Sequence, residues 1–248
     1  GHPLGGGHWW TEGYWHLLEK VRQEKPADCM LTTECNGEPY IRWMDGYLTW
    51  HWQYDGQVPA FPAVYGGAIQ MFGRSYGGGP TRDLALRMRA AQQLVFGEQL
   101  GWISPAVVNE KENAEFLKQL AQLRWQLREY FYAGRMLRPP QSDRPVPTVK
   151  ADWQWGGIRW VTTNAILSGC WWQPGKSRAV VIAVNVSDQP VETTLIADLA
   201  PAFSSDTPLR VEPVGPAPAV TAETSPAGVR IPLTIPPRSA WAWQVTPQ

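Results

Sequence analysis

Apolar and polar residues in the first 138 positions follow two alternating patterns. Helical spacing of apolar residues predicts helices at 11–24, from 82 to about 96 and from 110 to about 133, with a short helix near 38–48. Short apolar runs between them predict strands at 29–33, 58–66 and 99–103, although two prolines weaken the middle run. Alternation of helices and strands is typical of an α/β unit with a parallel sheet.

The pattern changes after residue 138. Four prolines occur between residues 139 and 147, which predicts a linker over 139–149. Short runs with period-two alternation follow, separated by turn sequences such as "QPGKS" and "SDQP". We therefore expect two domains, an α/β unit at 1–138 and an all-β, antiparallel β-sandwich at 150–248.

The composition of the chain argues against several classes of function. The chain has 248 residues, with 22 basic and 22 acidic side chains and a formal net charge of +0. Without a basic cluster, a nucleic-acid partner is not expected. No apolar run reaches 18 residues, so no membrane span is expected either. The three cysteines form no CxxC pair, and we expect no metal site and no cofactor. The 15 tryptophans fit either a Trp-rich core or stacking on flat ligands such as sugar rings.

Four stretches carry a resemblance to a known group of proteins. They are "GHPLGGG" at 1–7, "LTTECNGEPYI" at 31–41, "DGYLTW" at 45–50 and "FGEQLGWISP" at 96–105. Together with the predicted sandwich, they resemble the C-terminal part of TIM-barrel glycoside hydrolases, closest to a poorly characterised group of glycoside-hydrolase-like proteins. The resemblance implies an incomplete (β/α)₈ barrel, consisting of its last three β/α units, with the rest of the barrel upstream of residue 1.

Within that barrel, the resemblance makes 29–33 strand 6, 58–66 strand 7 and 99–103 strand 8, with the count uncertain by one. Barrel active sites lie at the carboxyl ends of the strands. Glu34 directly follows the first predicted strand. Glycoside hydrolysis usually needs two carboxyl groups, so Glu34 is the predicted catalytic residue, and its partner is expected upstream of residue 1. The alternative is that Glu34 caps the next helix or pairs with an arginine such as Arg42.

Further residues are candidates for binding the sugar because they carry hydrogen-bonding groups or flat rings near predicted strand ends. They are His2, Glu38, Trp43, Asp45, Trp50, Tyr65 and Trp102. Each has a structural alternative. Glu38 fits the first turn of a helix, Asp45 fits a turn, and tryptophans often fill cores.

The sequence therefore predicts a fragment of a glycoside hydrolase that is inactive alone and whose parent acts on an oligosaccharide or polysaccharide. The alternative is a non-catalytic carbohydrate-binding or structural protein on a barrel scaffold. A secreted or periplasmic location is favoured for the parent. The sugar, the linkage and the stereochemical outcome are left open.

Overall fold

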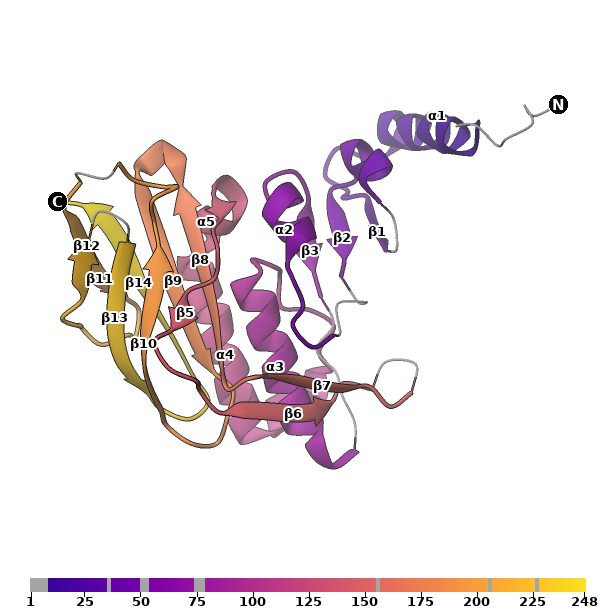
Figure 1. Cartoon of the computed structure of the whole chain (residues 1–248). Coiled ribbons are helices and arrows are strands. Elements are labelled where there is room, and N and C mark those ends of the chain that lie inside the picture. Colours follow the sequence, from indigo (N-terminus) through magenta and orange to yellow (C-terminus); the bar gives the residue numbers. More distant parts are fainter. Residues whose placement is uncertain are drawn as a thin grey trace.

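The computed structural model describes residues 9–34, 37–49, 54–73, 79–154, 157–204, 207–225 and 228–248. Figure 1 shows these residues as successive layers: a small parallel sheet, a layer of helices, and two antiparallel sheets that carry the C-terminus. His2 and Trp50 lie outside the described residues.

The parallel sheet contains three short strands in the order β1-β2-β3. The elements of this part are α1 (Trp9–Glu24), β1 (Thr32–Glu34), η1 (Glu38–Trp43), β2 (Gly46–Leu48), α2 (Ala60–Tyr65) and β3 (Gln70–Phe72). A single parallel bridge from Phe72 to Gln99 extends the sheet by one more segment. Among the described residues, β1 is the edge strand on the other side. The predicted parallel sheet is confirmed as a three-stranded sheet.

Two of the three predicted strands are corrected by the structure. Residues 58–66 form α2 instead of a strand, because Pro59 sits at the N-cap and Pro62 in the first turn, where a missing N–H is tolerated. Both prolines would interrupt a strand ladder. The strands β2 and β3, which the pattern did not predict, take the places beside β1. Of 99–103, only Gln99 pairs with the sheet.

The helix layer follows the sheet in sequence. It contains η2 (Gly79–Thr81), α3 (Arg82–Val95), η3 (Pro105–Asn109), α4 (Lys111–Gln126) and α5 (Arg128–Ala133). Every residue of α3 from Ala85 to Val95 is buried, although the sequence predicted one apolar face only. The reason is its place in the centre of the molecule, with contacts to α4, to the β6 strand and to the β8 strand (Figure 1).

The predicted antiparallel strands form in the C-terminal part. They are β4 (Arg135–Met136), β5 (Gln141–Ser142), β6 (Thr148–Asp152), β7 (Trp160–Asn164), β8 (Ile166–Gln173), β9 (Arg178–Asn185), β10 (Val191–Asp198), β11 (Leu209–Val214), β12 (Glu223–Ser225), β13 (Gly228–Ile235) and β14 (Ser239–Pro247), with η4 (Pro174–Lys176) between β8 and β9. One sheet has the order β12-β13-β10-β5, the other β11-β14-β9-β8-β4, and β6 pairs with β7 in a ribbon. The proline-rich segment 139–149 contains β5, which pairs with β10, and the start of β6.

Strand β9 shows how the layers are held together. Its residues from Ala179 to Asn185 are buried on both faces. Val180, Ile182 and Val184 belong to an apolar cluster that includes the helices, whereas Val181 and Ala183 belong to the cluster shared by the two antiparallel sheets. Because side chains alternate along a strand, one sheet forms the wall of both cores.

Trp171 of β8 links the five-stranded sheet to the helices. It is 1% exposed, and its Nε1–H donates to the Val95 carbonyl at 3.0 Å. Its ring meets Phe131 edge-on, with 5.2 Å between ring centroids. Gly97 ends α3 at a φ of +77°, and a Cβ there would lie 2.7 Å from the Trp171 ring. The site therefore requires glycine for both conformation and space.

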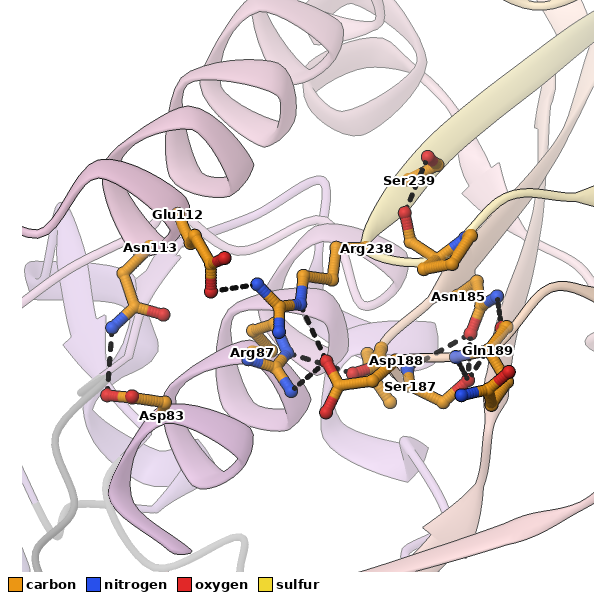
Figure 2. Close-up of polar contacts among 12 residues, drawn as sticks. Asp83, Arg87, Glu112, Asn113, Asn185, Ser187, Asp188, Gln189, Arg238 and Ser239 are labelled. Atoms are coloured by element: carbon orange, nitrogen blue, oxygen red, sulfur yellow. Dashed lines mark hydrogen bonds and ion pairs between the residues drawn. The ribbon is translucent and has the colours of Figure 1, made fainter.

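An ion network fixes the helices to the end of the antiparallel sheets (Figure 2). Arg87 of α3 has a side chain that is only 4% exposed. It donates to the Val186 carbonyl at 2.9 Å and to Asp188 at 3.1 Å. Asp188 also accepts from Arg238 at 2.6 Å, and Arg238 in turn pairs with Glu112 of α4. Two loops of the antiparallel sheets are thereby bound to two helices.

Removing Asp188 and removing Glu112 are expected to change the stability of the protein by unequal amounts. Asp188→Ala leaves the buried Arg87 guanidinium with one carbonyl partner, so we expect a loss of about 2 kcal/mol in the free energy of unfolding. Glu112→Ala removes a side chain that is 73% exposed and is expected to change this energy by less than about 0.5 kcal/mol. Urea unfolding of both variants measures the difference. Equal effects would show that Arg87 does not depend on Asp188.

Candidate functional site at the carboxyl edge of the parallel sheet

The carboxyl ends of β1, β2 and β3 lie at one edge of the sheet because the strands run parallel. Glu34 is paired in register with Leu48, and Leu48 with Phe72. The chain leaves this edge after each strand, at Glu34, Thr49 and Gly73. The segments that follow, 35–36, 50–53 and 74–78, lie outside the described residues.

Glu34 lies on the sheet face that points away from the helices. Tyr47 and Met71, the central residues of β2 and β3, belong to the helix-side core. Side chains alternate along strands, so Glu34, Leu48 and Phe72 share the opposite face. The Glu34 residue is exposed. A carboxyl group in this position can meet a ligand above the strand ends.

The structure places Asp45 and Trp43 at the other edge. Asp45 directly precedes β2 and accepts two hydrogen bonds from Arg22, at 2.8 and 2.9 Å, and one from the Leu31 N–H at 2.7 Å. Burial alone would raise the pKa of Asp45, but the bonds from Leu31 and Arg22 hold it below its usual value. Asp45 thus joins α1 to the amino end of the sheet and is separated from Glu34 by the strand length.

Trp43 has little ring surface to offer a ligand at its site. It is 7% exposed, and its Nε1–H donates to Glu19 of α1 at 2.8 Å. Its ring packs beside that of Trp15, 5.6 Å between centroids. Trp43 therefore contributes to the packing of η1 against α1.

The other sugar-binding candidates that the structure describes lie on three different segments of the chain. Glu38 is exposed in the first turn of η1. Tyr65 ends α2 with its ring 4.9 Å from that of Phe61. Trp102, three residues beyond the bridge at Gln99, is 56% exposed and has a φ of +49°. A tryptophan in the left-handed region is strained, and such strain often occurs at functional sites.

A buried polar cluster supports the same edge from the helix side. Its centre is Glu98, which is 1% exposed and accepts a 2.5 Å hydrogen bond from the Thr49 hydroxyl. Thr49 directly follows β2 and lies on the helix side, as Tyr47 does. Gln93 of α3 accepts from the Gly101 N–H at 3.2 Å. A Cβ on Gly73 would lie 2.5 Å from the Gln93 amide nitrogen and 2.7 Å from the Glu98 carboxyl. The cluster therefore fixes the starts of two loops.

Burial raises the pKa of Glu98 to about 8, because the charged carboxylate loses its solvation there. The Thr49 hydrogen bond and the charges of Arg89 and Arg124 oppose this shift only partly. A cavity of about 10 Å³, about the room for one water molecule, lies between Glu98, Thr49, Arg89 and Trp153. The Trp153 Nε1–H is buried there and finds no acceptor among the described residues.

Larger hollows occur elsewhere. A groove of about 960 Å³ runs between the loop that starts at Tyr54, the proline-rich segment and the β6–β7 ribbon. Among the residues that the structure describes there, Asp143 pairs with Arg144, and none of those that line the groove belongs to β1, β2 or β3. No group of three or more His, Cys, Asp or Glu side chains in the described part of the chain could hold a metal ion. In that part, no helix is long and apolar enough to cross a membrane.

The chain is similar to one protein family and to several known proteins. Residues 1–76 match a family described as a domain of unknown function, DUF6259. A protein of Bacteroides thetaiotaomicron named "Putative glycoside hydrolase" is 31% identical over 207 residues, covering 79% of this chain and 29% of that protein. One of the same designation from Monosiga brevicollis is 29% identical over 235 residues, covering 80% of this chain and 19% of that protein. This chain is distantly related to these two proteins, each of which has a name that begins "Putative glycoside hydrolase".

Among solved structures, a GH27 β-L-arabinopyranosidase from Geobacillus stearothermophilus is similar over 99% of this chain and 56% of that one, at 11% identity and a TM-score of 0.43. This distant relative of named glycoside hydrolases spans less than a third of the length of the curated relatives that it matches.

Sequence reasoning missed the Glu98 cluster. The stretch "FGEQLGWISP" contributed to the resemblance, but its acid was not singled out. One signal was present, since Glu98 stands between the glycine that ends a helix and the apolar run after Gln99. Its hydrogen-bond partner Thr49 is 49 residues away in the sequence, and the polar residues of α3 resemble ordinary surface positions.

Proposed function

We propose that the parent of this chain hydrolyses glycosidic bonds and that Glu34 is one member of its catalytic carboxyl pair. The observation that supports this most is the position of Glu34, an exposed acid that ends a parallel strand on the face opposite the helices. The relationship to named glycoside hydrolases supplies the reaction class. We further propose that the parallel sheet is part of a (β/α)₈ barrel, where this face would line the interior.

The second carboxyl group is proposed to come from another part of the parent. The segments that follow β2 and β3 at this edge, 49–57 and 73–78, contain one acid, Asp55. Asp55 accepts the Thr162 N–H at 2.7 Å and is thus bound to the β6–β7 ribbon. The structure places two strands, β2 and β3, between β1 and Gln99, where the sequence predicted one, so β1 is no longer strand 6 when strands are counted back from the segment at Gln99.

Assays of the full-length protein test this proposal. Glu34→Gln keeps the size of the side chain but cannot exchange a proton or attack, so turnover of aryl glycosides is expected to fall by about 10²- to 10⁴-fold. Glu115→Gln, the same change at an exposed position of α4, serves as the matched control and should retain most turnover. Unchanged turnover in Glu34→Gln would remove Glu34 from the reaction. A parent that binds oligosaccharide without cleaving it would favour a carbohydrate-binding protein.

A further inference from the structure

A second groove lies on the outer surface of α4. Its volume is about 630 Å³, and it runs between α4 and the turn that follows β11. The residues that line it are Gln119, Ala121, Gln122, Leu123, Trp125, Gln126 and Pro216. None of them belongs to the parallel sheet or to the loops at its carboxyl edge, so the groove is separate from Glu34.

The polar part of the groove is formed by amides alone. Gln119, Gln122 and Gln126 are spaced by three and four residues, which places them on one face of α4. Each amide can both donate and accept hydrogen bonds, and none of the described residues that line the groove has an ionisable side chain. Gly215, at a φ of +62°, leaves room for the Gln126 amide, because a Cβ there would lie 2.5 Å from its Oε1. Such a lining suits a neutral ligand with many hydroxyl groups.

Trp125 supplies a flat apolar surface beside these amides. It is 67% exposed. The Arg128 guanidinium lies 4.3 Å from its ring centroid and donates to the Trp125 carbonyl at 2.7 Å, which holds the cation over one face of the indole. The other face can stack on the C–H face of a pyranose ring. The only other apolar groups in the lining are Ala121, Leu123 and Pro216, and Leu123 is almost fully buried. This is too little apolar surface to anchor a partner helix or strand.

We propose that this groove is a non-catalytic binding site for a neutral saccharide, with Trp125 as the stacking surface and Gln122 and Gln126 as hydroxyl partners. The proposal goes beyond hydrolysis at Glu34, which does not need this surface. A site of this kind would keep a polysaccharide near the enzyme while cleavage takes place elsewhere, and it would raise the effective concentration of substrate.

Native gel electrophoresis of the chain in gels that contain arabinoxylan, galactomannan, mixed-linkage β-glucan or starch tests the site. The wild-type chain is expected to be retarded by at least one of these neutral polysaccharides. Trp125→Ala should weaken the retardation at least tenfold, and Gln122→Ala by a smaller factor. Trp160→Ala, at a tryptophan that is 50% exposed and lies outside the groove, serves as the matched control and should bind as the wild type does.

Two results would overturn the proposal: no retardation of the wild-type chain in any gel, or equal retardation of wild type and Trp125→Ala. Circular dichroism verifies that each variant is folded. Glu34→Gln is expected to bind as the wild type does, because Glu34 lies outside the groove. Loss of hydrolysis in the parent and loss of binding at α4 are therefore separate outcomes, and either proposal can fail alone.

Discussion

Replacing Trp171 by alanine is expected to lower the free energy of unfolding by about 4 kcal/mol. The change removes a ring that is 1% exposed, leaves a cavity against Gly97 and Phe131, and leaves the Val95 carbonyl without the indole N–H. The cavity cannot close easily, because Gly97 directly follows the buried helix α3 and Phe131 belongs to α5. Urea unfolding followed by far-ultraviolet circular dichroism measures the effect.

Trp160→Ala is the matched control for this change, since it removes the same side chain at a site that is 50% exposed. It is expected to lower the free energy of unfolding by less than about 1 kcal/mol. Trp171→Phe should fall between the two, because it keeps ring volume but not the hydrogen bond. If Trp171→Ala were no more harmful than Trp160→Ala, the helices and the five-stranded sheet would not depend on this contact.

Stability should also depend on the protonation of Glu98. Its pKa is about 8 in the folded protein, against 4.5 for an ordinary glutamate, so between these values the folded state binds a proton that the unfolded state does not. Raising the pH through this window therefore favours unfolding, at about 1.4 kcal/mol for each pH unit. The stabilising contribution is complete below pH 4.5 and is lost as the pH rises through 8.

Comparison with Glu98→Gln isolates this effect, because the amide is neutral at all these pH values and can still accept from the Thr49 hydroxyl. Between pH 5 and pH 8 the wild type should lose about 4 kcal/mol relative to the variant. Glu115→Gln, at an exposed position of α4, should follow the wild-type profile. A constant difference between wild type and Glu98→Gln across the window would mean that the folded protein holds Glu98 ionised throughout.

The candidate site could be predicted from the sequence only where the signal is local. Glu34 follows an apolar run, and that position was enough to place it at a strand end. The sequence also makes Asp45 and Trp43 candidates for binding the sugar, and both lie within 11 residues of Glu34. The structure separates them, since Asp45 precedes β2 and Glu34 ends β1, at opposite edges of a parallel sheet.

Local periodicity by itself determined the helices α1, α3 and α4, most of the antiparallel strands and the change of character near residue 139. Each of these elements is long enough for several repeats of its own period. Tertiary structure alone decided which three-residue segments form the parallel sheet, because strands as short as β2 and β3 carry no readable period. It also decided the complete burial of α3 and the partners of its polar side chains. Thr49 meets Glu98 across 49 residues and Arg87 meets Asp188 across 101, and such contacts follow from the packing of whole layers.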